Sequence, residues 1–383
     1  MITLGSDTSD IRIPPDVLRE LAGGGDWISS WWSVALLSLL AAGGVFWAVR
    51  RRRAHRWSWP MWTCASLAVF AALGLTANIV VGYVPNVAAA RVTLSSWGLA
   101  GPPAPIEHGS ARSRAGGRDE GSVEAVHVPA PAADAMPSSS LTWVYTPPGY
   151  GTDPSSRYPV VYLVHGSPGE GGDWFAAGDV AHVMDILLDH QLVDPMIVVA
   201  LDVNGTGPSA VDTECLDSTT GGSQVETYLT RTVVPWVDAT YRTTADWKHR
   251  TIGGFSSGGF CALDQGLRHP ELYGTILALD TTGDPGTGGT AMLATQAEWE
   301  EHDVTAYAST IPLPHPVAVF VDLAGANDGD PRKDSTAIAD ALRARGQDVF
   351  QREEKGLDHT WNFARAAIPY GLVFASRQMG TTP

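Results

Sequence analysis

The sequence predicts an α/β protein, a mostly parallel sheet with helices on both faces, preceded by a pair of membrane-spanning helices. Three observations lead to this fold class. Two long uncharged apolar runs lie near the N-terminus, and short β-branched runs alternate with helical segments after Gly121. A Gly-x-Ser-x-Gly motif, residues 254–258, lies between a predicted strand and a predicted helix. Regular strand–helix alternation is typical of parallel sheets that helices cover on both sides.

The two apolar runs predict a helical hairpin that crosses a membrane. Ile28 to Val49 contains 22 uncharged residues and Met61 to Val84 contains 24. About 20 residues suffice for a helix to cross the hydrocarbon core of a bilayer. Tryptophan and tyrosine lie near the ends of both runs, as interfacial aromatic residues do: Trp27, Trp31, Trp32, Trp47, Trp57, Trp59, Trp62 and Tyr83.

The charges around the hairpin predict its orientation. Five arginines occupy residues 50–56, between the runs, and a short basic loop stays cytoplasmic. Everything before Ile28 and after Val84 then lies outside the cytoplasm. A cleaved signal peptide is the alternative, which the lack of a basic start and the second apolar run disfavour.

The chain therefore divides into four parts. These are an extracytoplasmic segment (1–27), the hairpin (28–84, with spans at about 28–49 and 61–84), a linker (85–119) and a catalytic domain (120–383). Proline and glycine without apolar periodicity predict that the linker is flexible. The whole chain has a net charge of −16. The part from Glu120 onward contains 14 Lys and Arg and 34 Asp and Glu, so the negative charge is concentrated there. So acidic a domain argues against nucleic acid as a partner and against charge-driven adhesion to anionic lipid.

The elements of the catalytic domain follow in order. Short runs rich in β-branched residues predict strands that are buried on both faces. The predicted strands are Val123–Val128, Leu141–Thr146, Tyr158–His165, Pro195–Leu201, Arg250–Gly254, Thr275–Leu279, Val317–Leu323 and Asp348–Glu353. The predicted helices are Val180–Leu192, Val225–Tyr241, one that starts at Gly259, and Ser335–Arg345. Active sites of such sheets lie beyond the carboxyl ends of the strands.

The Gly-x-Ser-x-Gly motif indicates a nucleophile. A serine on a sharp strand-to-helix turn has its hydroxyl exposed above the sheet, and the glycines let strand and helix pass closely. We therefore interpret Ser256 as the nucleophile.

Several segments resemble the putative-esterase family of the α/β-hydrolase superfamily, which includes esterase D, feruloyl esterases and the antigen 85 mycolyltransferases. They are residues 158–166, 226–237, 253–259, 269–273 and 356–361, and the resemblance covers roughly residues 140–380. It implies an α/β-hydrolase fold and a serine esterase or acyltransferase that needs no cofactor. It leaves the substrate open, because members cleave different esters. The two-span anchor departs from the secreted mycolyltransferases.

The resemblance assigns the partners of Ser256. The superfamily has the chain order Ser, Asp or Glu, His, and His359 follows the last predicted strand, so it is the expected base. The acid is expected after the strand Val317–Leu323, where Asp328 is the first choice and Asp330 the second. Asp340 is the third, because the mycolyltransferases take their acid from the corresponding helix.

Two backbone N–H groups are expected to bind the oxyanion that forms during attack. One belongs to Ser257, the residue after the nucleophile, and the other, by position in the family, to Ser167. His165 is interpreted as part of the loop backbone. Trp174 either lines the acyl or leaving-group pocket or packs in the core.

Cys215 and Cys261 both lie on the oxidising side if the topology holds, which predicts a disulfide near the active site, with two buried thiols as the alternative. Cys64 lies within a span and is excluded. No zinc pattern, phosphate loop or dinucleotide fingerprint is present, so no metal or cofactor is expected. An acidic loop lacks calcium-ligand spacing and predicts a solvated face: Asp202, Asp212, Glu214 and Asp217.

The sequence thus predicts a membrane-anchored extracytoplasmic serine esterase that acts on cell-envelope lipid or sugar esters. Transfer of the acyl group to a sugar or lipid hydroxyl uses the same residues and is the alternative. A rival from another class is an inactive hydrolase fold that binds envelope partners, which would have an incomplete triad. The sequence does not specify the ester, the acyl chain length or the oligomeric state.

Overall fold

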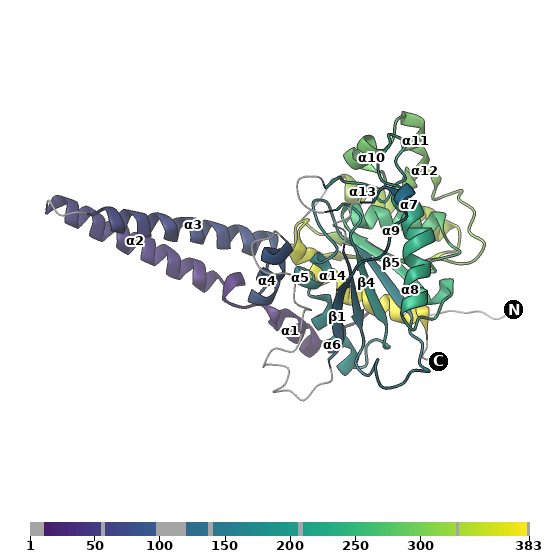
Figure 1. Ribbon diagram of the computed structural model, residues 1–383, viewed down its shortest axis with the longest axis horizontal. Coiled ribbons are helices and arrows are strands. Elements are labelled where there is room, and N and C mark those ends of the chain that lie inside the picture. Colours follow the sequence, from purple (N-terminus) through teal and green to yellow (C-terminus); the bar gives the residue numbers. More distant parts are fainter. Residues whose placement is uncertain are drawn as a thin grey trace.

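The computed structural model describes residues 11–54, 58–96, 120–136, 141–205, 210–326 and 329–380, and its centre is one eight-stranded sheet (Figure 1). The strand order is β1-β2-β4-β3-β5-β6-β7-β8. The β1–β2 and β2–β4 pairs are antiparallel and all others are parallel, which confirms the predicted sheet. The strands are β1 (Ser122–Val126), β2 (Thr142–Thr146), β3 (Val160–Val164), β4 (Ile197–Leu201), β5 (Arg250–Phe255), β6 (Thr275–Leu279), β7 (Ala318–Ala324) and β8 (Asp348–Glu354).

Helices cover both faces of the sheet and bury two separate cores. Successive side chains of β3 point to opposite faces of the sheet, so Tyr162 belongs to one core and Leu163 to the other. The first core packs against α7 (Val225–Tyr228), α8 (Val234–Thr240), α9 (Ser257–Arg268) and α13 (Asp330–Ala344). The second packs against α5 (Asp173–Ala176), α6 (Val180–Asp189) and α14 (Trp361–Met379). Short helices follow β6, namely α10 (Gly286–Met292), α11 (Gln296–Glu301) and α12 (Val304–Tyr307).

Some helices differ from the expectation. The predicted helix over residues 225–241 is divided between α7 and α8 by a wider π turn, Leu229–Val233. The 19-residue α14 was not predicted, because it is buried around most of its circumference and contains Pro369. A helix that is apolar on most sides lacks the amphipathic period by which helices are recognised in a sequence.

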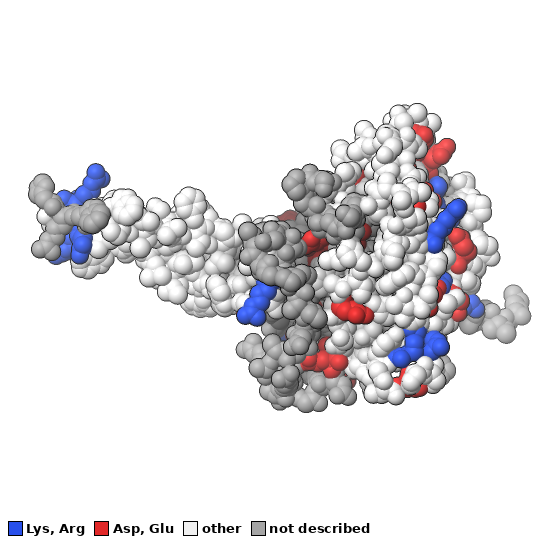
Figure 2. Space-filling view, in the orientation of Figure 1, with Lys and Arg blue, Asp and Glu red and all other residues white. Residues whose placement is uncertain are grey.

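The two N-terminal apolar segments form long helices that pack side by side and project from the domain (Figure 1). α2 (Trp31–Arg53) and α3 (Trp59–Val81) each contain 23 residues, a length of about 35 Å. Their mean hydropathies of 1.9 and 2.1 make both apolar enough to cross a membrane, by length and composition. Arg50–Arg53 form the last turn of α2 rather than a loop. Figure 2 shows these basic side chains at the far tip and an uncharged shaft on the visible face.

The segments that flank the hairpin contact the sheet domain. α1 (Pro15–Leu21) lies against α6, and Ile11, Ile13 and Val17 are buried in the second core. The predicted linker begins with a helix, α4 (Val87–Ser96), so its first part is not a coil, and residues 97–119 lie outside the described residues. Both ends of the hairpin therefore lie at the domain (Figure 1).

Candidate active site

The turn between β5 and α9 holds Ser256 in a strained conformation. Its φ is 60° and its ψ is −124°, a region that non-glycine residues rarely occupy outside such turns. The glycines on either side are required by close packing. A Cβ on Gly254 would lie 2.1 Å from the carbonyl oxygen of Gly258, and one on Gly258 would lie 2.2 Å from that of Val164. The motif thus lets strand and helix approach while the serine side chain projects outward.

Ser256, His359 and Asp280 form a continuous chain of hydrogen bonds. The Nε2 atom of His359 lies 2.8 Å from the Oγ of Ser256, and its Nδ1 lies 2.6 Å from an Oδ of Asp280. The imidazole is 39% exposed, whereas the carboxylate is fully buried. Phe255 packs against the imidazole, with ring centroids 4.7 Å apart. A hydroxyl bonded to an imidazole that a buried carboxylate orients is the arrangement that activates a serine for attack on a carbonyl.

Asp280 is a residue that the sequence analysis missed. It directly follows β6, the neighbour of the nucleophile strand β5. Its second carboxylate oxygen accepts a hydrogen bond of 2.9 Å from the N–H of Ala324, at the end of β7. One oxygen is thus fixed by the sheet while the other faces His359.

Among the described residues, the structure brings Asp280 to the Nδ1 of His359 and neither Asp330 nor Asp340, the second and third candidates for the acid. Asp328 lies outside the described residues. The second choice, Asp330, is the first residue of α13, and the third, Asp340, pairs with Arg343 at 3.0 Å. The sequence did contain a signal for this acid, because Asp280 directly follows the predicted strand Thr275–Leu279 at the edge where active sites lie.

The two expected oxyanion donors flank the nucleophile. Ser257 is the first residue of α9, and Ser167 belongs to the loop after β3. That loop lies against the nucleophile, because a Cβ on Gly166 would be 3.2 Å from the Cβ of Ser256. Among the described residues, no hydrogen bond occupies the backbone N–H of Ser257 or of Ser167.

The loop after β3 is held by buried side chains. His165 is fully buried and donates from Nδ1 to the carbonyl of Gly166 at 2.8 Å. Trp174 is also fully buried, and its indole N–H donates to the carbonyl of Val164 at 2.9 Å. Of the two roles open to Trp174, burial of the whole side chain favours core packing over pocket lining.

This geometry agrees with a match of the sequence to a known protein family. The model of the esterase family, described as "Putative esterase", matches residues 134–364. The chain belongs to this esterase family. The match includes the strands β2 to β8 and all three residues of the hydrogen-bonded chain.

Individual relatives match the chain over part of their length. An uncharacterized protein of Corynebacterium glutamicum is 34% identical over 147 residues, which are 38% of this chain and 33% of that protein. An esterase of Mycobacterium tuberculosis is 29% identical over 155 residues, 39% of this chain and 31% of the relative. The chain thus matches about a third of the length of these curated relatives.

Solved structures share the fold. A ferulic acid esterase superposes with a TM-score of 0.59 at 24% identity, over 68% of this chain and all of that one. An S-formylglutathione hydrolase from Agrobacterium tumefaciens superposes with a TM-score of 0.56 at 18% identity, over 68% of this chain and 96% of that one. The chain therefore has the α/β-hydrolase fold.

A disulfide joins Cys215 and Cys261. Cys215 lies in the segment that follows β4, and Cys261 lies in the nucleophile helix α9, so the bond ties this segment to the active-site helix. Cys64 lies in α3 and is a free cysteine.

Reduction of this disulfide is expected to destabilise the domain. The cysteines are 46 residues apart, and loss of such a cross-link costs about 4 kcal/mol in a chain-entropy estimate. We expect dithiothreitol to lower the melting temperature of the wild type to that of a Cys215→Ala/Cys261→Ala variant, which itself does not respond. Cys64→Ala is the matched control and should keep the full response; a wild type insensitive to reductant would contradict the prediction.

The acidic loop is not the solvated face that was predicted. Asp202 and Glu214 are 3% and 8% exposed. Burial, together with the charges of Asp212 and Asp284, raises the pKa of Glu214 well above its usual value. Asp217 accepts hydrogen bonds from the N–H and the hydroxyl of Thr227, at 2.9 and 2.5 Å. These carboxyls belong to the segment around Cys215 and are mostly withdrawn from solvent.

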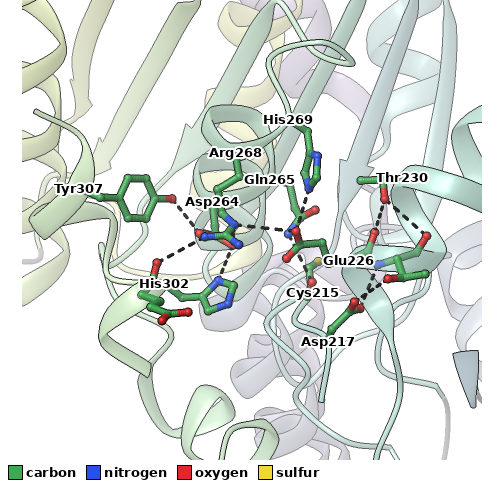
Figure 3. A network of polar contacts seen from close by, with 12 residues as sticks. Cys215, Asp217, Glu226, Thr230, Asp264, Gln265, Arg268, His269, His302 and Tyr307 are labelled. Atoms are coloured by element: carbon green, nitrogen blue, oxygen red, sulfur yellow. Dashed lines mark hydrogen bonds and ion pairs between the residues drawn. The ribbon is translucent and has the colours of Figure 1, made fainter. Parts of the chain in front are cut away.

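A polar network fixes the outer side of α9 (Figure 3). The fully buried Asp264 accepts hydrogen bonds from Tyr307 at 2.7 Å and from His302 at 3.0 Å. Ligand atoms of Glu226, Asp264 and His302 lie within 4.8 Å of one another, a spacing that a metal ion could bridge. Arg268 already places its guanidinium 3.9 Å from both carboxylates, so we interpret the group as an ion network that joins α9 to α7 and α12.

The pair of Glu226 and His269, at one end of this network, is expected to make the stability of the domain depend on pH. Burial opposes ionisation of Glu226, but its hydrogen bond with His269 and the charge of Arg268 outweigh burial and lower its pKa. Burial also disfavours the charged form of His269, yet hydrogen bonds with Glu226 and Glu271 outweigh it and raise its pKa. The Glu226 contribution is lost as pH falls through its lowered pKa, and the His269 contribution as pH rises through its raised pKa.

We therefore expect Glu226→Gln to lower the melting temperature more at pH 6 than at pH 9. Glu124→Gln is the matched control, because Glu124 bonds to the Tyr241 hydroxyl and not to a histidine. A Glu226→Gln deficit that is equal at both pH values would show that the histidine is not coupled to this carboxylate.

Proposed function

We propose that the chain is a membrane-anchored serine esterase whose catalytic domain lies outside the cytoplasm. The observation that carries the proposal is the continuous contact from Ser256 through His359 to the buried Asp280, at 2.8 and 2.6 Å. His359 takes the proton of the Ser256 hydroxyl as the oxygen attacks the ester carbonyl. Asp280 holds the imidazole in the required tautomer and stabilises its charged form.

The proposed cycle has two halves. The N–H groups of Ser257 and Ser167 bind the oxyanion, and His359 returns its proton to the departing alcohol, which leaves an acyl group on Ser256. His359 then deprotonates a water molecule that attacks the acyl carbon. The bond from this carbon to the Ser256 oxygen breaks, His359 returns the proton to that oxygen, and the acid leaves. A sugar or lipid hydroxyl in place of water gives an acyltransferase. The complete set of three residues argues against a purely binding role.

Several features support the membrane anchor. Both helices of the hairpin are long and apolar enough to span a bilayer, and four arginines lie at the far end of α2. A basic tip is the end that stays cytoplasmic, which places α1 and the domain on the opposite side. Because the domain is held at the bilayer, we propose cell-envelope lipid or sugar esters as substrates.

The test uses the full chain in nanodiscs. We expect a fluorophosphonate probe to label it and p-nitrophenyl esters to be hydrolysed. Addition of a sugar acceptor distinguishes transfer, through an acylated sugar product, from hydrolysis alone. An alkaline-phosphatase fusion after Pro383 is expected to be active, as it is only outside the cytoplasm. Absence of labelling in folded protein would refute the enzyme and favour a binding role, and unchanged envelope lipids in a deletion strain would refute the substrate class.

A further inference from the structure

The end of α3 contacts the two loops that carry the candidate catalytic groups. Asn362, three residues after His359, donates from its side-chain amide to the carbonyls of Ile79 and Val80 at 2.9 and 3.0 Å. Arg365 donates to the carbonyl of Gly82 at 3.0 Å. The start of α14, and with it the His359 loop, is therefore bonded to the last turn of the hairpin.

The segment just beyond α3 also contacts the loop that contains Ser167, through a hydrogen bond from Tyr83 to Asp173. The hydroxyl of Tyr83, just beyond α3, donates to one carboxylate oxygen of Asp173 at 2.7 Å. The other oxygen of Asp173 accepts from the backbone N–H of Glu170 at 3.0 Å. Asp173 is 2% exposed, so Tyr83 and Glu170 take the place of water on a buried carboxylate.

The Asp173 carboxylate lies at the centre of a tightly packed loop. A Cβ on Gly169 would meet the carbonyl of Gly166 at 2.5 Å, the Asp173 carboxylate at 2.8 Å and the Nδ1 of His165 at 3.0 Å. Ser167 lies between Gly166 and Gly169. Displacement of the Asp173 side chain would therefore displace the backbone that carries the Ser167 N–H.

We propose that Tyr83 is a positioning residue for the active site, and that the end of the hairpin completes the catalytic domain rather than only tethering it. Tyr83 holds Asp173, Asp173 holds the loop of Ser167, and Asn362 holds the loop of His359 against the same turn of α3. The proposal rests on the proposed esterase function, because it assigns Tyr83 a role in that reaction. Loss of the Tyr83 hydroxyl would leave a buried carboxylate oxygen unpaired and would loosen the oxyanion donor.

The test compares Tyr83→Phe with Tyr241→Phe in the full chain in nanodiscs. Tyr241 is the matched control, because its hydroxyl also donates to a carboxylate, that of Glu124 at 2.8 Å, but on the α8 and β1 side of the domain. With a water-soluble p-nitrophenyl ester, we expect Tyr83→Phe to lower kcat about ten-fold with KM unchanged within two-fold, since removal of a whole oxyanion donor costs roughly 10²–10³. Tyr241→Phe should keep the wild-type kcat, with a similar fall in melting temperature.

A second variant keeps the test decisive if Tyr83→Phe folds poorly. Asn362→Ala removes both hydrogen bonds to the last turn of α3 and leaves Asp173 unchanged, and we expect it also to lower kcat several-fold at constant KM. A wild-type kcat in the folded variants, or an equal loss in Tyr241→Phe, would overturn the proposal. A wild type without esterase activity would instead refute the proposed function, so the two failures are distinct.

Discussion

Replacement of Ser256 by alanine is expected to abolish ester hydrolysis and covalent labelling. The Ser256 hydroxyl is the group at this turn that bonds to His359, and loss of the serine of such a triad lowers kcat by roughly 10⁴–10⁶-fold. Little change in stability is expected, because alanine keeps the Cβ and the hydroxyl bonds to a half-exposed imidazole rather than to the core. Turnover of p-nitrophenyl acetate and the mass of the fluorophosphonate adduct on the Ser256 peptide measure the two effects.

Ser309→Ala is the matched control for this experiment. Ser309 is an exposed serine after α12, and its replacement should leave turnover and labelling at the wild-type level. Labelling that persists in Ser256→Ala would identify another nucleophile. Labelling that disappears while hydrolysis continues would separate the labelled site from the hydrolytic one, and either result contradicts the mechanism.

Much of the fold could be predicted, because parallel strands buried on both faces give short β-branched runs. The bounds of β6, Thr275–Leu279, agree with the prediction, and other strands differ by a few residues. α14 could not be predicted, since its residues are determined by packing in the second core and not by an amphipathic pattern. The helix α4 was likewise missed in a segment interpreted as a linker.

The candidate site could be predicted in part. Ser256 has a local signature, because a strand, two glycines and a helix must meet around it, and the structure places His359 in contact with it. The acid has no such signature. Several loops follow strands at the same edge of the sheet, and the sequence does not specify which of their carboxylates faces His359.

Three-dimensional contacts favour Asp280 as the acid. This residue has a φ of 44°, which bends the chain at the end of β6, and the N–H of Ala324 holds one oxygen of its carboxylate. β6 also lies beside β5, so a side chain at its carboxyl end is near the nucleophile. These relations depend on the register of three strands, which the residues of any one strand do not specify.

Asp280→Asn is accordingly the substitution with the second largest expected effect. Asparagine keeps the size of the side chain and can still accept from Ala324, but its amide lacks the negative charge that stabilises the imidazolium and can favour the wrong tautomer of His359. We expect kcat for p-nitrophenyl ester hydrolysis to fall by roughly 10³–10⁴ while KM stays within a few-fold.

Asp328→Asn and Asp340→Asn provide the decisive comparison, because both carboxylates were candidates from the sequence. If Asp280 orients His359, these two variants keep kcat within about two-fold of the wild type. A large loss in Asp328→Asn together with an active Asp280→Asn would assign the acid to the loop after β7 instead. Loss in Asp280→Asn alone would show that the acid of this esterase follows β6, and that the contact of Ser256, His359 and Asp280 is the catalytic one.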